Sequence, residues 1–384
     1  DKVYWLGAND RRTSFFENMW PLPDGVSYNS YLIVDEKIAL VDTIEYGSSD
    51  DYLDKIEKII DGRSIDYLII NHMEPDHSGA IKTIVNKYPD IKLVGNLKTF
   101  KIVESYFGYK DNWYQVEDGD ILELGYHKLK FIMTPWVHWP ETMITYLQED
   151  KILFSCDFFG SHLATNETFV TDENKILEDA KRYYAEIMMP FRAIIRKNIE
   201  KLSDLDIKMI APSHGPVYKN PSAIIDSYKE WISEEVKNEV VIPYVSMHES
   251  TLIMVEYLVN ELIKKGIDVK PFNLPKTDIG ELAMSLVDAA TVIVASPTVL
   301  AGAHPAAVYA TFLTNALRPK TKFVGIIGSY GWGGKMVEQL SGLLGNLKVE
   351  IIDPVLVKGR PNEDDFDALD KLVEQVVENH KTIK

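Results

Sequence analysis

The sequence predicts an α/β protein of two domains, and three observations lead to this fold class. The chain has 384 residues, more than one hydrophobic core usually organises. Its first part contains short apolar runs of strand length separated by turn residues. Its last part alternates between such strands and amphipathic helices, the pattern of a doubly wound parallel sheet. We place residues 1–237 in the first domain and residues 238–384 in the second.

The first domain is predicted from its β-rich runs. These runs are SYNSYLIVD, IALVDT, IDYLIINH, IKLVGN, LKFIMTP and KILFSCD. A longer helical stretch is expected around residues 175–205, and the strand KMIAPSHGP follows it. Residues 222–238, SAIIDSYKEWISEEVKN, are predicted to form a polar amphipathic helix that connects the two domains.

The second domain is predicted from its strict alternation. Its strands are expected at VVIPYVS, DVKPFNL, TVIVASP, KFVGIIGS and KVEIIDPVLV, with a helix after each. Five strands that alternate with helices predict a parallel sheet covered on both faces. Ligands of such sheets bind at the carboxyl ends of the strands, so the loops that follow these strands are the candidate binding residues.

Composition excludes several classes of function. The formal charge is −17, so a nucleic-acid backbone would be repelled, and no Lys/Arg cluster offsets this. No run approaches ~18 uninterrupted apolar residues, so no membrane span is expected. The single cysteine, Cys156, cannot form an intrachain disulfide, and no CxxC pair exists to hold a rubredoxin-type iron. These features are typical of a cytoplasmic protein.

Four candidate metal ligands follow the apolar run IDYLIINH directly: His72, Glu74, Asp76 and His77. A solvated turn is the alternative interpretation. It is disfavoured because carboxylates and imidazoles packed against an apolar strand would repel or desolvate one another unless a cation lies among them. The cluster therefore predicts a metal site at the end of this strand.

Three further candidate ligands lie at the ends of later apolar runs. His138 stands in MTPWVHWPETM, Asp157 in ILFSCDFFG and His214 in IAPSHGP. Each follows an apolar run and precedes Gly, Pro or bulky residues, which places it at the mouth of a sheet. The other histidines lack such company and are expected to be ordinary core or surface residues: His127, His162, His248, His304 and His380.

The loops after three strands of the second domain indicate a second site. The first loop carries Ser246, Met247, His248, Ser250 and Thr251 at the start of a helix, where backbone N–H groups and hydroxyls favour a phosphate. An ordinary N-cap is the alternative interpretation of this loop alone. The other two loops contain small residues and aromatic rings that suit a flat ligand. They comprise Pro297, Thr298, Val299 and Leu300, and then Ser329, Tyr330, Gly331, Trp332, Gly333 and Gly334.

The motif His-x-Glu-x-Asp-His, followed by a distant His, an Asp and a last His, resembles the metallo-β-lactamase fold in its flavodiiron version. The usual zinc hydrolases of that superfamily carry His at the third position of the motif, where this chain has Glu74. The loops of the second domain resemble those of a flavodoxin, although Glu249 departs from the Gly common in that loop and is expected to face solvent. The resemblance covers the whole chain. It implies an αββα sandwich followed by a flavodoxin-like five-stranded parallel sheet.

The same resemblance implies ligands and cofactors. His72, Glu74 and His138 resemble the ligands of one iron, Asp76, His77 and His214 those of the other, and Asp157 the bridging carboxylate. In some relatives the residue equivalent to His77 does not bind iron. FMN is implied at the loops of the second domain. Tyr183, Tyr184 and Trp139 are the candidate pocket-lining residues, with a purely structural role in the core as the alternative.

The implied activity is reduction of O2 to water, of NO to N2O, or of both, with electrons passed from FMN to a diiron centre. The electron donor is external: rubredoxin, a rubredoxin reductase or reduced F420. The alternatives are a zinc-dependent hydrolase fused to a flavodoxin, against which Glu74 argues, and an electron carrier with a vestigial first domain, against which the full ligand set argues.

Assembly is predicted from distance. A helical connector of about twenty residues would span roughly 30 Å, and nothing in the sequence folds the flavin back onto its own diiron site. Electron transfer needs close approach, so exchange between chains is favoured. We therefore expect a head-to-tail homodimer, or a dimer of such dimers, because closed two-fold assemblies are the commonest.

Overall fold

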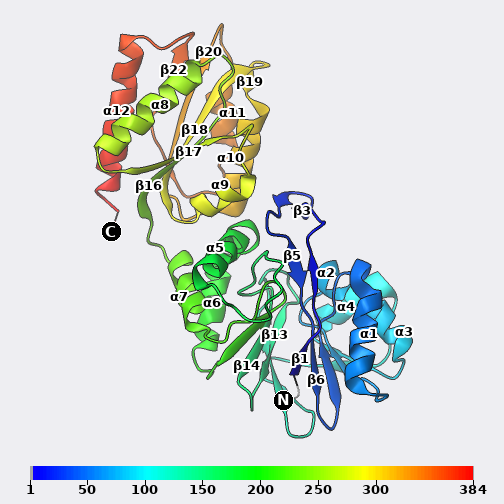
Figure 1. Cartoon of the computed structure of the whole chain (residues 1–384). Helices are drawn as coiled ribbons and strands as arrows, with labels where there is room; N and C mark the ends of the chain where they lie inside the picture. Colours follow the sequence, from blue (N-terminus) through cyan, green and yellow to red (C-terminus); the bar gives the residue numbers. More distant parts are fainter. Residues whose placement is uncertain (1–2, 384) are drawn as a thin grey trace. The chain divides into compact units, whose positions relative to one another are not determined.

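The computed structural model describes residues 3–383, and the chain divides into two compact units (Figure 1). The first unit comprises the described residues up to Tyr184 together with Phe191–Lys229. The second comprises Ala185–Pro190 and the described residues from Glu230 onward. The division falls between Lys229 and Glu230, within the helix Ser222–Trp231. A functional domain boundary at 237/238 stays a prediction. Among residues 3–383, no helix is long and apolar enough to cross a membrane.

The first unit contains two large sheets that pack face to face. The first sheet has the order β1-β6-β7-β8-β9-β10, and its strands are β1 (Val3–Trp5), β6 (Tyr31–Val34), β7 (Ile38–Val41), β8 (Tyr67–Ile69), β9 (Lys92–Gly95) and β10 (Trp113–Gln115). The second has the order β11-β12-β13-β14-β15, and its strands are β11 (Ile121–Glu123), β12 (Lys128–Met133), β13 (Met143–Leu147), β14 (Ile152–Cys156) and β15 (Met209–Pro212). Alternate apolar side chains of both sheets, such as Val41, Phe131 and Phe154, form the core between them.

Helices and two small hairpin-like sheets complete this unit. The helices are η1 (Tyr46–Ser48), α1 (Ser49–Ile60), α2 (Pro75–Ser78), α3 (Ile81–Lys87), α4 (Leu97–Phe107), α5 (Glu173–Tyr183), α6 (Arg192–Leu202) and α7 (Ser222–Trp231). Between α5 and α6 the chain passes through η2 (Tyr184–Met188) and η3 (Met189–Phe191), most of whose residues are assigned to the second unit. The small sheets pair β2 (Ala8–Asp10) with β5 (Val26–Tyr28), and β3 (Phe15–Phe16) with β4 (Trp20–Pro21). Figure 1 shows α1, α3 and α4 beside the first sheet and α5, α6 and α7 beside the second, so the layers are those of the predicted αββα sandwich.

The second unit contains one parallel sheet with the order β17-β16-β18-β20-β21, as the alternating pattern predicts. Its strands are β16 (Lys237–Tyr244), β17 (Asp268–Asn273), β18 (Ala289–Val299), β20 (Phe323–Tyr330), β21 (Glu350–Ile351) and β22 (Val355–Lys358), and β19 (Gly302–Ala303) pairs antiparallel with β18. Its helices are α8 (Ser250–Lys264), α9 (Ile279–Leu286), α10 (Pro305–Leu317), α11 (Met336–Gly342) and α12 (Glu363–His380). The strand β22 continues the edge of β20 beyond β21, which is a flavodoxin-type arrangement.

Two helical segments differ from the sequence-based expectation. The stretch around residues 175–205 is broken, because Pro190 has no backbone N–H and cannot continue a helix; α5 passes through the π-helical and 3-10 turns before α6 begins at Arg192. The connector helix is also shorter than expected. It ends at Trp231, where Ser233 N donates to Glu230 O in a closing turn, so the predicted span of roughly 30 Å is wrong for this helix.

Candidate metal centre and flavin site

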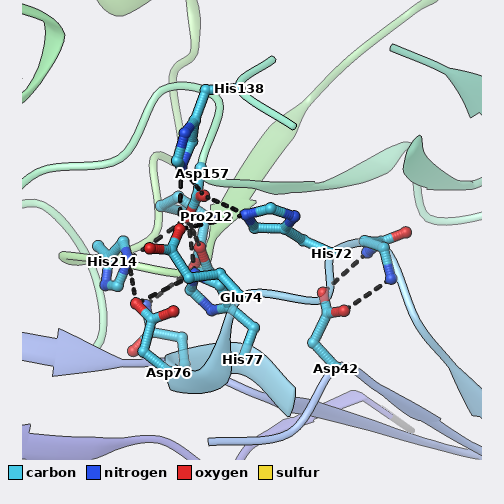
Figure 2. A network of polar contacts seen from close by, with 12 residues as sticks. Asp42, His72, Glu74, Asp76, His77, His138, Asp157, Pro212 and His214 are labelled. Atoms are coloured by element: carbon cyan, nitrogen blue, oxygen red, sulfur yellow. Dashed lines mark hydrogen bonds and ion pairs between the residues drawn. The ribbon is translucent and has the colours of Figure 1, made fainter. Parts of the chain in front are cut away.

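The seven candidate metal ligands of the first unit converge at one edge of its two sheets (Figure 2). The loop after β8 carries His72 and Glu74, and the short helix α2 that follows carries Asp76 and His77. His138 lies in the loop between β12 and β13, Asp157 directly follows β14, and His214 follows β15. Because these strands end at the same edge, their terminal residues meet although they are distant in sequence.

One set of ligands gathers around one oxygen of Asp157. The Nε2 atom of His72 lies 3.4 Å from Asp157 Oδ2 and 3.3 Å from Glu74 Oε2. The Nε2 atom of His138 lies 3.3 Å from the same Asp157 oxygen and 3.0 Å from the same Glu74 oxygen. Two imidazole nitrogens and two carboxylate oxygens therefore face one point.

A second set gathers around the other oxygen of Asp157. The Nε2 atom of His77 lies 2.9 Å from Asp157 Oδ1 and 3.3 Å from Asp76 Oδ2. The Nε2 atom of His214 lies 3.3 Å from each of these two oxygens. The ligand atoms of His72, Glu74, His138 and Asp157 all lie within 4.8 Å of one another, and so do those of Asp76, His77 and His214. Asp157 thus presents one oxygen to each of two similar ligand sets.

The residues of the two sets fit a pair of bound cations, because an unusual number of their buried polar atoms lack hydrogen bonds. Such atoms include both oxygens of Asp76, Oδ2 of Asp157 and the Nε2 atoms of His77 and His214. Buried polar groups in native proteins nearly always have a partner, so a cluster of exceptions needs an explanation. Mixed imidazole and carboxylate ligands suit iron and also zinc.

The candidate flavin loops of the second unit line a cavity of about 400 Å³ at the carboxyl ends of the strands. The structure brings most of the predicted residues to this cavity: Met247, His248, Ser250, Thr251, Pro297, Thr298, Val299, Leu300, Ser329, Tyr330, Gly331, Trp332 and Gly333. Ala301 and Gly359 also line it, and sequence reasoning missed both. Ser246 and Gly334 are not among the lining residues.

The first flavin loop has the local geometry of an anion site. Ser246 Oγ accepts a hydrogen bond from Leu252 N at 3.2 Å, which folds the loop over the start of α8. Thr251 Oγ1 lies 3.1 Å from Ser329 Oγ, so hydroxyls of two loops meet inside the cavity. The side chain of Glu249 is 70% exposed, in line with the expectation that it faces solvent. Binding of a phosphate at the N-terminus of α8 stays a prediction.

Comparison with known proteins gives consistent similarities across the chain. The family model described as ODP family beta lactamase matches residues 26–215. The chain is 37% identical to a nitric oxide reductase of Moorella thermoacetica over 361 residues, which covers 92% of this chain and 90% of the relative. It is 32% identical to an anaerobic nitric oxide reductase flavorubredoxin of Aliivibrio salmonicida, covering 94% of this chain and 74% of that protein.

Solved structures are similar over almost the entire length. Rubredoxin oxygen:oxidoreductase from Desulfovibrio gigas matches with a TM-score of 0.95 and 30% identity, over 99% of this chain and 97% of that one. The flavodiiron protein from Giardia intestinalis matches with a TM-score of 0.93 and 28% identity, over 98% of this chain and 95% of that one. This chain belongs to the flavodiiron protein family.

Three imidazoles of this flavodiiron protein favour the protonated form when no metal is present. Burial alone would lower the pKa of His138, but its contacts with Asp157 and Glu74 outweigh this and raise the pKa to about 9. Burial would also lower the pKa of His214. Its contacts with Asp157 and Asp76 outweigh this effect and raise the pKa to about 10. The pKa of His72 is likewise raised well above its ordinary value, against burial, by Glu141 and Glu74.

Two carboxylates of the cluster, Asp157 and Glu74, favour the ionised form. Burial would raise the pKa of Asp157, but the surrounding imidazoles, His77 foremost, hold it well below its ordinary value. Burial would also raise the pKa of Glu74, and His138 and His72 lower it instead. The site without metal is therefore a network of carboxylates and imidazolium groups.

The aromatic candidates differ in their relation to the metal ligands. The ring of Trp139 packs edge-on against His72 with 5.1 Å between centroids, and the ring of Tyr183 lies 5.7 Å from that of His214. Tyr184 packs against Tyr228 at 5.5 Å. Trp139 and Tyr183 thus contact the ligand set, while a catalytic role for any of the three stays a prediction.

Sequence reasoning missed three residues beside the cluster. Glu141 is fully buried with its Oε1 atom 2.8 Å from His72 Nδ1. His162, taken for an ordinary histidine, lies 5.7 Å from the His214 ring, and burial followed by the charge of His214 lowers its pKa well below the usual value. Glu17 lies in an exposed left-handed turn between β3 and β4, and partial desolvation, followed by the charge of Glu74, raises its pKa. For Glu17, the one available sequence signal was the turn that contains it.

Proposed function

We propose that this flavodiiron protein reduces O2 to water, NO to N2O, or both, at a diiron centre that receives electrons through FMN from an external donor. Membership of the family makes the chain an oxidoreductase. The observation that carries the proposal is the position of Asp157, which offers one oxygen to each of two sets of two imidazoles and one carboxylate. Such an arrangement suits two cations held close together.

The proposed ligands follow from the geometry of the two sets. His72, Glu74 and His138 would hold one iron, and Asp76, His77 and His214 the other, with Asp157 between them. All four imidazoles face the cluster through Nε2, including His77. When bound, the two irons supply reducing equivalents and coordination positions at which O2 or two NO molecules come together.

The surrounding residues orient the ligands and restrict water. The Nδ1 atom of His214 lies 2.8 Å from the carbonyl oxygen of Ser27, and Ser213 Oγ donates to Asp157 Oδ1 at 2.8 Å. These contacts fix the ring of His214 and leave Asp157 Oδ2 for the first set. Trp139 and Tyr183 cover two of the imidazoles with apolar surface, which keeps solvent from the ligand atoms.

A zinc hydrolase fused to a flavodoxin is the competing function. Glu74 argues against it, because a carboxylate where hydrolases of this fold carry His hardens the site and adds negative charge. Glu74 Oε2 contacts both imidazoles of its set, which supports a role for this carboxylate as a metal ligand. Metal analysis of anaerobically purified protein separates the two functions.

FMN is proposed to bind in the cavity of the second unit. Ser246, Ser250 and Thr251 would hold its phosphate at the start of α8, and the loops at residues 297–301 and 329–333 would hold the ring. The donor that reduces FMN is proposed to be rubredoxin, a rubredoxin reductase or reduced F420. The loops carry no feature that selects one of these three.

We also propose a head-to-tail homodimer in which the flavin of one chain serves the irons of the other. Leu300 and Trp332 border the flavin cavity and are each 92% exposed, and large apolar side chains this exposed are typical of a surface that another chain covers. Two inactive variants test this: one lacks FMN through changes at Ser246 and Ser250, and the other lacks iron through His72→Ala and His138→Ala. Exchanged mixtures should regain activity. A forced monomer that turns over at the full rate, with mixtures that stay inactive, would exclude the dimeric arrangement.

The principal test quantifies iron, zinc and flavin in anaerobically purified protein and then follows O2 and NO consumption with a reduced donor. We expect about two irons and one FMN per chain and consumption of at least one of the gases. Two tightly held zinc ions, no iron and activity that survives would refute the proposal. Asp157→Asn should lose at least one metal. The carboxylate presents one oxygen to each ligand set, whereas the amide presents an oxygen to one set and an NH2 group to the other.

A further inference from the structure

A buried carboxylate lies directly behind one of the candidate ligands. Glu141 belongs to the loop between β12 and β13, and its side chain is fully buried. Its Oε1 atom lies 2.8 Å from His72 Nδ1, on the side of the ring opposite to the metal cluster. The same oxygen accepts a hydrogen bond from the backbone N–H of Met73 at 3.0 Å. One oxygen thus fixes both the ring of His72 and the backbone next to it.

The carboxylate of Glu141 is buried at a cost in desolvation. Its Oε1 atom has two partners, the imidazole of His72 and the backbone N–H of Met73. Its other oxygen, Oε2, is buried and has no hydrogen-bond partner. A buried carboxylate with an unsatisfied oxygen is unfavourable for folding alone, which points to a role toward the ligand.

The backbone of Glu141 is anchored independently of His72. The Nδ2 atom of Asn96 donates to the carbonyl oxygen of Glu141 at 2.6 Å, while Asn96 Oδ1 caps α4 by accepting from the N–H groups of Lys98 and Thr99. Lys98 Nζ also donates to the carbonyl oxygen of Pro140 at 3.2 Å. The carboxylate is therefore fixed to a helix terminus and does not depend on the histidine for its position.

The outer nitrogens of two other imidazoles of the cluster have different surroundings. His214 Nδ1 lies 2.8 Å from a neutral carbonyl oxygen, that of Ser27. His77 Nδ1 is buried without a hydrogen-bond partner. Both rings belong to the second ligand set. His72 of the first set therefore has a charged acceptor at its outer nitrogen, whereas the outer nitrogens of His77 and His214 have none.

We propose that Glu141 is a positioning residue for His72, and that it makes the two metal positions unequal. It accepts the Nδ1–H of His72, which selects the tautomer whose Nε2 lone pair faces Glu74 and Asp157. The negative charge also makes that imidazole a stronger donor to a cation. The metal of the first set is held more tightly than it would be without this charge. The inference rests on the proposed presence of two metals at this site.

The experiment measures metal release from anaerobically loaded protein to an excess of chelator, as a time course that resolves two equivalents. In Glu141→Ala, one equivalent should leave ~10- to 100-fold faster than in the unaltered protein, as is usual for loss of such a partner, and the other should leave at its original rate. Glu141→Gln keeps the length of the side chain and one acceptor oxygen but removes the charge, so it should give an intermediate rate. Because Gln is nearly isosteric, it tests the proposal even where the alanine variant folds poorly.

A matched control exists in the same unit. Asp35 Oδ2 lies 2.6 Å from His127 Nδ1 and accepts the His127 backbone N–H at 2.8 Å, so it repeats the geometry of Glu141 away from the metal cluster. Asp35→Asn should lower the melting temperature and leave both release rates unchanged. Equal acceleration in the Asp35 and Glu141 variants, or unchanged release in Glu141→Ala, would overturn the proposal.

The outcome separates this inference from the proposed function. Release kinetics report on whichever metal the site holds, so zinc in place of iron would contradict the proposed function and still test Glu141. Iron with normal gas consumption but unchanged release in Glu141→Ala would contradict only the role of Glu141. A protein that binds no metal at the first ligand set would overturn both, and metal analysis identifies that case.

Discussion

Metal binding to this flavodiiron protein should release protons, and the number follows from the structure. In the metal-free site, His138 has a pKa of about 9, His214 of about 10, and the pKa of His72 is raised well above the ordinary value. All three are therefore protonated at about pH 7. A cation binds a neutral imidazole, so these three imidazoles together should release about three protons when metal saturates the site.

The cost of this deprotonation is large enough to measure. At about pH 7, removing the proton costs roughly 3 kcal/mol for His138 and roughly 4 kcal/mol for His214, from their distances to pH 7 at about 1.4 kcal/mol per unit. Apparent metal affinity should therefore rise steeply with pH between about pH 7 and about pH 9. The assay adds ferrous ion or zinc anaerobically to metal-free protein in weak buffer and titrates the released acid.

Two variants make the count specific. His138→Gln should lower the release at saturating metal by about one proton, because it removes one imidazolium group. His162→Gln should leave the count unchanged, because the pKa of His162 is well below its usual value and this buried neighbour is neutral in both states. Release of less than one proton by the unaltered protein would refute the assigned charges of the metal-free site.

The same shifts fix the sign of the stability change with pH. A raised imidazole pKa in the folded protein contributes stability that is fully present below the unfolded value of about 6.5 and is lost as pH rises through the folded values. The metal-free protein should therefore melt at progressively lower temperature between about pH 7 and about pH 10. Metal-loaded protein should not show this loss, because its imidazoles are already neutral and have no imidazolium proton to lose.

Other regions give simpler predictions. Residues 238–384 expressed alone should fold and bind FMN, and preference for FAD would contradict this. Cys156→Ser should keep both metals in elemental analysis, because burial, followed by the charge of Asp42, raises the thiol pKa well above its ordinary value and keeps the thiolate from forming. Burial lowers the pKa of His380, so the second unit should lose stability as pH falls below about 6.5, by at most about 1.4 kcal/mol per pH unit, and His380→Gln should flatten this slope in thermal melts. Gly328→Ala should destabilise the second unit by more than about 2 kcal/mol in denaturant titrations, because the added Cβ would overlap the backbone carbonyl oxygen of Ser296.

The arrangement of strands was predictable from sequence because it depends on local pattern. Apolar runs of four to eight residues with turn residues between them indicate strands, and their alternation with helices indicates a parallel sheet. Helix lengths were less predictable. The closing turn at Ser233 and the π-helical turn before Pro190 depend on hydrogen bonds that composition does not reveal.

The candidate metal site was predictable for a different reason. Each of its seven residues follows an apolar run, and strand ends of a sandwich meet at one edge, so convergence follows from topology. Glu141 was missed because its partner His72 lies 69 residues away and nothing in WPETM marks the carboxylate as buried. The division of Asp157 between two ligand sets was likewise out of reach, because it depends on the rotation of one side chain.

The flavin site shows a similar limit. The three loops after β16, β18 and β20 were predictable from the rule for parallel sheets. Gly359 was missed because it reaches the cavity from the edge strand β22, where its N–H donates to Tyr330 O at 2.9 Å. Its φ of +79° suits glycine in that position, and a sequence contains no signal for which distant loop such a turn will approach.

Charge balance connects the metal ligands with the residue behind them. The carboxylates that contact the cluster or its imidazoles are Glu74, Asp76, Asp157 and Glu141. Without metal, imidazolium groups offset this buried negative charge, which is why the imidazole pKa values rise and the proton count is predictable. Two divalent cations supply four positive charges, which match the four carboxylates once the imidazoles are neutral. Without Glu141 the same two cations would exceed the fixed negative charge of the site. The loss should be felt most at His72 in the first ligand set, because this is the ring that Glu141 contacts.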